Sequence, residues 1–214
     1  MGKSSRQLWT TQILEGKTSK NKANSYSEAE AKWRGSSKYI EKKITSQVAA
    51  LSGSQLVGKV LGIDPSLRGT GLAMIQSMPD GSLRYLKSET VKNSPAMSMT
   101  ECLGRIFERT LNMIDGFKPD CIAIEQSVYV QNFKTAMILG SSRGAAIAAA
   151  GYRDLKVYEY PPLRIKQAVI GYGRASKEQV ARSVMALLNE RTLLPSDEAD
   201  AAGAAITHIF TKKV

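Results

Sequence analysis

The chain has 214 residues, of which 43% are apolar, enough for one globular domain with a sizeable core and a tail. Thirty lysine and arginine residues against nineteen acidic ones give a net charge of +11, which is atypical of a metabolic enzyme and favours a polyanionic partner, most often nucleic acid. Two cysteines exclude a disulfide framework, and the lack of a hydrophobic leader or a membrane-length apolar run predicts a soluble, cytoplasmic protein.

Residues 1–55 differ in composition from the rest and are predicted to form a basic N-terminal extension, partly helical or disordered. They hold ten lysine and arginine residues against four glutamates, which is more than half of the net charge. Apolar residues recur at helical spacing from Ile40 through Ile44 and Val48 to Leu51. Two interpretations stay open: a solvated tail that docks one helix on the main domain, and an additional arm that contacts DNA.

The remaining residues, 56–214, are predicted to form a single α/β domain that begins with hairpins. Three strands separated by turn signals come first, in KVLGIDP (59–65), GLAMIQSM (71–78) and SLRYLKSETV (82–91). Apolar residues at helical spacing predict a helix over residues 97–116.

Strands and helices then alternate. DCIAIEQ (120–126) and LKVYEY (155–160) read as short buried strands, with a helix over 132–151 between them. Three helical stretches follow, near 163–170, 176–190 and 197–210. This order predicts a five-stranded mixed sheet flanked by helices.

Four acidic residues occupy positions that suit one cleft. Asp64 and Glu125 each end a buried strand, and ligand chemistry in open α/β sheets gathers at strand ends. Asp197 and Asp200 lie three residues apart on one face of an alanine-rich helix. Three of the acids also have an ordinary explanation: Asp64 as a turn residue before a proline, Asp197 as a helix N-cap, and Asp200 as a favourable charge near a helix start.

Together, the four carboxylates indicate a metal centre. Carboxylates crowded into one site repel one another and take up protons unless cations compensate their charge. Oxygen ligands without histidine or cysteine favour Mg²⁺ or Mn²⁺. Two such ions can hold a phosphodiester, activate water and stabilise the leaving oxygen.

Four blocks of the chain resemble, in order and spacing, the RuvC Holliday junction resolvases of bacteria. The blocks are LGIDPSLRGTG, AIEQSVYVQNFKTAMILGSSRGAAIAAA, YEYPPLRIKQAVIGYGRASKEQV and DEADAAGAAITH, and the resemblance covers roughly residues 59 to 210. It implies a ribonuclease-H-like fold, a homodimer, and symmetric cleavage of a four-way DNA junction that leaves 5′-phosphate and 3′-hydroxyl ends. It also implies two Mg²⁺ ions per active site, replaceable by Mn²⁺, and cooperation with the RuvA–RuvB branch-migration motor.

The resemblance also assigns roles to individual residues. The metal-binding carboxylates of the family fall on Asp64, Glu125, Asp197 and Asp200. Two lysines near the scissile phosphate fall on Lys166 and Lys177, where a cation offsets charge that develops in the transition state. Positions in the DNA-facing blocks are expected to contact the nucleic acid: Arg68, Tyr129, Asn132, Lys134, Arg143, Arg164 and Arg174.

The chain departs from the family pattern in two places. Ser66 stands where the family usually has glycine, so the turn must differ if that position needs a positive φ. The family often has a junction-wedging phenylalanine three residues after the strand-end glutamate, where this chain has Val128. Tyr129 or Phe133 is a candidate replacement, with stacking on an unpaired base as the expected contact.

Two other functions are compatible with parts of the sequence. A junction-binding architectural protein could keep the fold, although loss of one or more acids would be expected in it. An actin-like kinase or ATPase shares a similar first phosphate motif, but it needs a duplicated domain that this length does not allow. The single histidine, His208, is predicted to be a packing or helix-end residue.

Deleting residues 1–55 is expected to weaken DNA affinity at moderate salt more than it slows cleavage at saturating DNA, because it removes ten positive charges. Junction affinity measured by fluorescence anisotropy over a range of salt concentrations tests this. The slope of log affinity against log salt becomes shallower by about 0.9 for each phosphate that the protein no longer neutralises. An unchanged slope would exclude the segment from the DNA interface.

Overall fold

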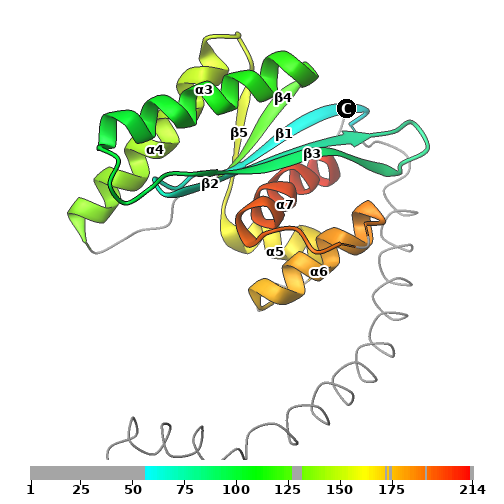
Figure 1. The fold of residues 1–214 in the computed structure, drawn as a ribbon. Coiled ribbons are helices and arrows are strands. Elements are labelled where there is room, and N and C mark those ends of the chain that lie inside the picture. The colour runs from blue at the N-terminus through cyan, green and yellow to red at the C-terminus, as the bar shows by residue number, and fades with distance from the viewer. Residues whose placement is uncertain (1–55, 127–131, 172, 174, 191, 213–214) are drawn as a thin grey trace, which may run out of the picture. The chain divides into compact units, whose positions relative to one another are not determined.

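The computed structural model describes residues 56–126, 132–171, 173, 175–190 and 192–212, and the expectations for residues 1–55 lie outside this range. The described residues form a five-stranded sheet in the order β3-β2-β1-β4-β5 with helices on both faces (Figure 1). Helices α3 and α4 cover one face, and α5, α6 and α7 cover the other. The elements are β1 (Gly58–Asp64), β2 (Gly69–Ser77), β3 (Leu83–Lys92), α3 (Met99–Phe117), β4 (Cys121–Glu125), α4 (Phe133–Gly151), β5 (Val157–Tyr160), α5 (Pro162–Ile170), α6 (Lys177–Leu188) and α7 (Ser196–Thr211).

The sheet is mixed, as predicted. β1 pairs antiparallel with β2, and β2 with β3, whereas β4 runs parallel to both β1 and β5. β1 contributes to the core on both faces because alternate side chains of a strand point to opposite sides. Val60 joins the core beneath α5, α6 and α7, while Leu61 and Ile63 join the core beneath α3 and α4. Asp64 ends the strand on the same face as Val60, which is the face that α7 covers.

Helix α7 packs with its backbone directly against the sheet. A methyl group added to Gly62 would lie 1.9 Å from the carbonyl oxygen of Ala201, and one added to Gly71 would lie 1.9 Å from that of Asp197. Both approaches are too close for any side chain, so these two positions require glycine. Residues 201–209 of α7 are all buried, and four of them are alanines.

The predicted order of strands and helices is confirmed, and the ends differ by a few residues for local reasons. Helix α3 starts at Met99 because Ser98 and Glu101 form a capping box. Helix α6 ends at Leu188 because Asn189 adopts a left-handed conformation with φ 54°. None of the helices in the described part of the chain is both long and apolar enough to span a bilayer.

His208 lies inside the domain, as predicted for a packing residue. Its side chain is buried against the ring of Tyr158, with ring centroids 4.4 Å apart, and its Nδ1 is 2.7 Å from the hydroxyl of Tyr160. Burial, together with the nearby charge of Lys212, lowers the pKa of His208 to about 4. The imidazole is therefore neutral near pH 7 and contributes to the core.

Replacing Gly62 by alanine is expected to destabilise the domain by about 1–3 kcal/mol or more, because its methyl group must displace the backbone of α7. Urea unfolding of the Gly62→Ala variant measures this. The matched control is Gly104→Ala in α3, where an added methyl group meets no atom within 4 Å. It is expected to raise stability by up to about 1 kcal/mol. Equal stability of Gly62→Ala and wild type would contradict the close packing of α7 on the sheet.

Candidate active site

Asp64 and Glu125 lie side by side at the carboxyl ends of two parallel strands. The register of β1 and β4 pairs Ile63 with Ile124, so the residue that follows in each strand reaches the same level of the sheet. Both carboxylates lie on the face covered by α7, because each is an even number of residues beyond a side chain that packs in that core. Both side chains are half-buried. This geometry meets the expectation that the two acids lie together at the ends of their strands.

Helix α7 brings the other two acids to the same carboxyl ends of β1 and β4. A methyl group added to Gly69, just after the β1–β2 turn, would lie 2.9 Å from Oδ2 of Asp197. Asp200 is one turn further along α7 and is 18% exposed at its side chain. The alternative interpretation of Asp197 as an N-cap is wrong, because the N-cap position is Pro195 and no side chain caps this helix. Asp197 and Asp200 therefore extend from the first turns of α7 towards the end of β1.

The four carboxylates interact through charge. Burial raises the pKa of Asp64 to about 7 together with the charges of Glu125, Asp200 and Asp197, which contribute in that order of size. Burial also raises the pKa of Glu125, with Asp200 as the next cause. The pKa of Asp200 is raised mainly by burial and in smaller part by Asp197. We call these four residues the carboxylate cluster, and it carries more negative charge than its surroundings compensate.

Two lysines supply part of the missing positive charge. Nζ of Lys177, the first residue of α6, is 3.5 Å from Oδ2 of Asp200, and this carboxylate raises the pKa of Lys177. Lys166 on α5 lowers the pKa of both Glu125 and Asp200, so it too lies within electrostatic range of the cluster. The side chain of Lys177 is 78% exposed, which leaves its ammonium accessible to a ligand. The structure thus brings both predicted lysines to the predicted acids.

The turn that follows Asp64 is closed by hydroxyl groups. The hydroxyl of Thr70 donates to the carbonyl of Ser66 at 2.5 Å, and the Ser66 hydroxyl accepts from the Gly69 amide at 3.0 Å. Ser66 does not adopt a positive φ, because the left-handed non-glycine residues of the described chain are Lys118, Asp154 and Asn189. The turn differs from a glycine turn in using side-chain hydrogen bonds.

Arg68 and Asn93 attach the same turn to the segment before α3. The Arg68 guanidinium donates to the carbonyls of Ser94 at 2.5 Å and Met97 at 3.3 Å. The amide of the buried Asn93 side chain donates to the carbonyl of Leu67 at 2.8 Å. Sequence reasoning missed the role of Asn93, whose only signal was an amide residue at a strand end. For Arg68, predicted to contact DNA, the structure shows a bond to the protein backbone from an exposed residue.

The other predicted DNA contacts are distributed over α4 and α5. Asn132 caps α4 by accepting from the Thr135 amide at 3.1 Å, and Arg143 forms an ion pair with Glu159. Lys134 and Arg164 are exposed. Tyr129 and Arg174 lie outside the described residues. Phe133, the other candidate for the wedging residue, is 79% exposed at the start of α4.

The carboxylate cluster fits divalent metal ions by its chemistry. Its donors are all carboxylate oxygens, and raised pKa values show that added positive charge would favour the ionised form of Asp64, Glu125 and Asp200. In the described residues, no three histidine, cysteine or acidic side chains stand close enough to hold an ion as they are. Mutual repulsion among carboxylates that the two lysines compensate only in part opposes a closer approach in the absence of an ion.

Sequence comparison relates the chain to one nuclease family. The profile described as "Crossover junction endodeoxyribonuclease RuvC" matches residues 60–208. The protein of that name from Cupriavidus metallidurans is 40% identical over 150 residues, which cover 70% of this chain and 82% of the relative. Its counterpart from Rubrobacter xylanophilus is 37% identical over 164 residues, covering 76% and 90% of the two chains.

Solved structures give the same result. Thermus thermophilus RuvC, determined in complex with a Holliday junction substrate, is 36% identical and superimposes with a TM-score of 0.68, over 72% of this chain and 93% of that one. The yeast mitochondrial Holliday junction resolvase Ydc2 is 12% identical with a TM-score of 0.54, over 76% and 82% of the two chains. The latter likeness concerns the fold alone, and it agrees with the predicted ribonuclease-H-like architecture.

Asp64→Asn is expected to stabilise the metal-free protein at pH 8, by up to about 4 kcal/mol. The pKa of Asp64 is raised from 3.8 to about 7 in the folded state, so the folded chain binds this proton more tightly than the unfolded chain does. Stability therefore falls as pH rises from about 4 to about 7 and is level above that, and the variant escapes this loss.

Urea unfolding in a chelator at pH 4.5 and pH 8 measures the difference. The gain in the free energy of unfolding of Asp64→Asn over wild type should be large at pH 8 and small at pH 4.5. The control Asp80→Asn removes an exposed carboxylate from the β2–β3 turn and should bring no gain at pH 8. A destabilised Asp64→Asn protein at pH 8 would refute the electrostatic description of the cluster.

Proposed function

The chain belongs to the RuvC family of crossover junction endodeoxyribonucleases, and we propose that the carboxylate cluster is the centre at which it cuts four-way DNA junctions. Members of this family are Holliday junction resolvases and metal-dependent enzymes. The observation that carries the proposal is the convergence of Asp64, Glu125, Asp197 and Asp200 from three elements on one edge of the sheet, with a raised pKa of Asp64 as its electrostatic consequence.

The four carboxylates would hold two Mg²⁺ ions, with Mn²⁺ able to replace them. When bound, such ions supply an activated water and stabilise the leaving oxygen of an in-line displacement, which yields 5′-phosphate and 3′-hydroxyl ends. Asp64 and Glu125 are fixed by neighbouring strands and Asp197 and Asp200 by a buried helix, so the ligands are held on rigid elements. Because the backbone that carries them is fixed, only the carboxylate side chains have to move closer together when the ions and the phosphate bind.

Lys177 and Lys166 bind and orient the phosphate in this proposal. The exposed ammonium of Lys177 lies 3.5 Å from Asp200, so it can contact a phosphate oxygen while it remains beside the cluster. Lys166 approaches the same carboxylates from α5. Fixed positive charges beside the reacting phosphate favour the extra negative charge of the transition state. Further phosphate contacts are assigned to the exposed Lys134 and Arg164 and, on the resemblance alone, to the residues outside the described range.

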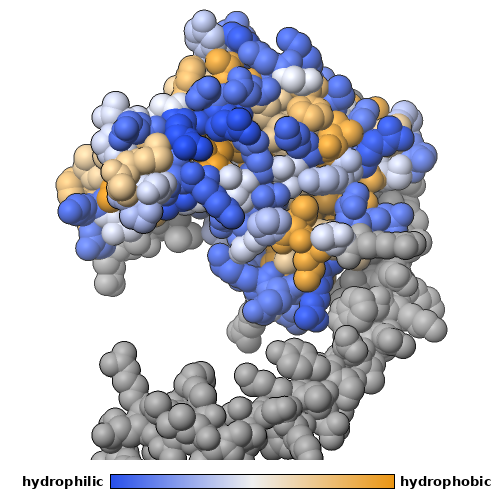
Figure 2. All heavy atoms as spheres, viewed as in Figure 1, coloured by the Kyte–Doolittle hydropathy of each residue, from blue (hydrophilic) through white to orange (hydrophobic). Residues whose placement is uncertain are grey.

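A homodimer is the assembly that we propose for cutting two symmetry-related strands. The start of α4 exposes Phe133, at 79%, and Met137, at 55%, and the same face continues through Gly140 and Gly144. Methyl groups added to these two glycines would meet no atom within 4 Å. Figure 2 shows hydrophobic residues among hydrophilic ones at the end of the domain where α4 begins. Such a face suits close contact with a second copy, which an isologous dimer supplies.

Two remaining assignments rest on the family resemblance and on charge. The RuvA–RuvB motor is the proposed partner that delivers the junction. Residues 1–55 are proposed to be a separate basic extension that adds DNA affinity, preceding a nuclease domain at 56–214.

Asp64→Asn is expected to keep junction binding and to lose cutting by at least about 10³-fold, since it removes one carboxylate from the centre. The assay uses a labelled four-way junction, with Mg²⁺ or with EDTA, and measures binding in the chelator and nicks in Mg²⁺. Asp80→Asn, remote from the cluster, should cut like wild type.

Each alternative predicts a different outcome. Retained cleavage by Asp64→Asn would contradict the assignment of the centre. A wild-type protein that binds the junction but produces no symmetric nicks at several Mg²⁺ concentrations would instead be an architectural junction-binding protein.

A further inference from the structure

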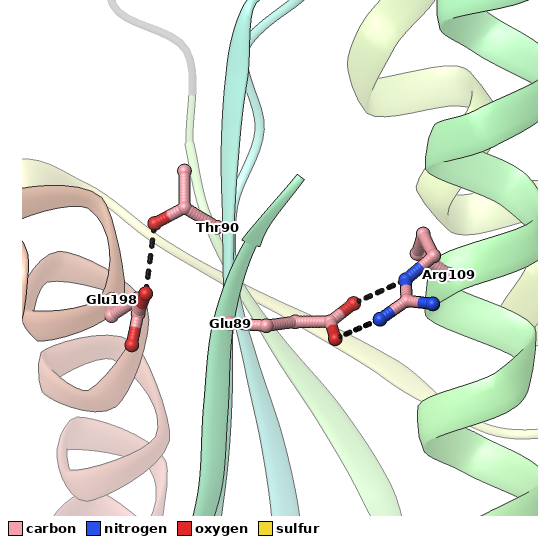
Figure 3. Close-up of polar contacts among 4 residues, drawn as sticks. All are labelled: Glu89, Thr90, Arg109 and Glu198. Atoms are coloured by element: carbon pink, nitrogen blue, oxygen red, sulfur yellow. Dashed lines mark hydrogen bonds and ion pairs between the residues drawn. The ribbon is translucent and has the colours of Figure 1, made fainter. Parts of the chain in front are cut away.

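Glu198 lies between Asp197 and Asp200 in the sequence. Its carboxylate is hydrogen-bonded to side chains of the edge strand β3. It accepts a hydrogen bond from the hydroxyl of Ser88. It also accepts one, at 3.0 Å, from the hydroxyl of Thr90 (Figure 3). Because the Ser88 hydroxyl donates to Glu198, it accepts in turn from the hydroxyl of Tyr85 at 2.8 Å. Both oxygens of Glu198 are therefore used by β3 side chains.

The carboxylate of Glu198 is directed to β3 and not to the cluster. The charges that raise the pKa of Asp64 belong to Glu125, Asp200 and Asp197, and Glu198 is not among them. Figure 3 shows its side chain extending from α7 towards Thr90. A residue next to Asp197 on a helix is rotated by about 100° from it, which directs Glu198 to the edge strand when Asp197 faces β1.

Apart from Glu198, the first turns of α7 are held by the buried Ala199 and by the ion pair of Asp200 with the exposed Lys177. Pro195 provides no side-chain cap, so the amides at the start of the helix are not held by an N-cap side chain. Gly62 and Gly71 set how closely the helix approaches the sheet, but these backbone contacts do not by themselves fix the rotation of the helix about its axis. Repulsion among the four carboxylates acts to push this turn away from the end of β1. The bonds of Glu198 to Ser88 and Thr90 oppose both movements.

We propose that Glu198 is a positioning residue for the nuclease centre, which holds the first turn of α7 through Ser88 and Thr90 so that Asp197 and Asp200 face Asp64 and Glu125. The inference rests on the proposed function of the cluster. It makes β3, which contributes no carboxylate to the cluster, part of the support of the metal ligands. Substitutions of residues that orient metal ligands commonly reduce metal affinity by about 10–100-fold.

The chain contains a matched control on the opposite face of the same strand. Glu89, between Ser88 and Thr90, forms a two-pronged ion pair with Arg109 of α3, with Nε to Oε1 at 2.9 Å and Nη2 to Oε2 at 2.5 Å (Figure 3). Glu89→Ala removes a glutamate that joins β3 to a helix, as Glu198→Ala does, but the helix carries no member of the cluster. Comparing the two variants separates the effect of losing a contact between β3 and a helix from the effect of displacing Asp197 and Asp200.

The experiment measures Mn²⁺ binding to the full chain without DNA by calorimetry, together with junction affinity in EDTA and cleavage in Mg²⁺. Glu198→Ala is expected to weaken Mn²⁺ binding by about 10–100-fold and to slow cleavage by about 100-fold, while junction affinity stays within about twofold. Glu89→Ala should leave all three near wild type. Ser88→Ala/Thr90→Ala should reproduce the effect of Glu198→Ala, and the triple variant should add little to it.

Three results would overturn the proposal. The first is an Mn²⁺ affinity of Glu198→Ala equal to that of Glu89→Ala. The second is a normal Mn²⁺ affinity of Ser88→Ala/Thr90→Ala when that of Glu198→Ala is reduced. The third is a loss of Mn²⁺ affinity in the triple variant that equals the sum of the two separate losses. If Glu198→Ala does not fold, Thr90→Val keeps the shape of the side chain and removes one bond, and it should weaken Mn²⁺ binding severalfold. Failure of the nuclease centre itself is distinguishable, because Asp64→Asn would then cleave normally.

Discussion

The arrangement of the centre depends on how closely α7 approaches β1 and β2. Because Gly62 and Gly71 have no side chains, the carbonyls of Ala201 and Asp197 can occupy the space that a side chain at these two positions would fill. That contact fixes the height of the helix above the sheet, and the height determines whether Asp197 and Asp200 reach the strand ends that carry Asp64 and Glu125. Packing, rather than any bond among the acids, therefore assembles the carboxylate cluster. Packing must also overcome the repulsion that their assembly creates.

The same centre is strained electrostatically and supported mechanically from several directions. Hydrogen bonds of the Ser66 and Thr70 hydroxyls close the turn after Asp64. Arg68 and Asn93 attach that turn to the segment before α3. Glu198 attaches α7, which carries Asp197 and Asp200, to β3. Lys177 offsets part of the charge but remains largely exposed. The result is a site that keeps excess negative charge in place, which suits the binding of hard divalent cations and disfavours the empty state.

Much of the fold and the four acids could be predicted from the sequence, because they depend on local patterns. Apolar periodicity indicated the order of strands and helices, and Asp64 and Glu125 followed from their places at strand ends. Close backbone approach at Gly62 and the pairing of Glu198 with Thr90 could not be predicted, because they join residues that are 139 and 108 positions apart. The protein partners of Arg68 and Arg143 depend on tertiary structure in the same way, whereas contact of these residues with DNA stays a prediction from the family resemblance.

The position of α7 in the chain has a consequence for biosynthesis. A nascent chain that ends before residue 197 contains β1 and β4 with Asp64 and Glu125 but lacks the other two carboxylates, and the sheet face over Gly62 stays bare. On the proposed function, such an incomplete chain lacks two of the four carboxylates of the centre. The cluster is complete only once α7 has been translated and has docked on the sheet.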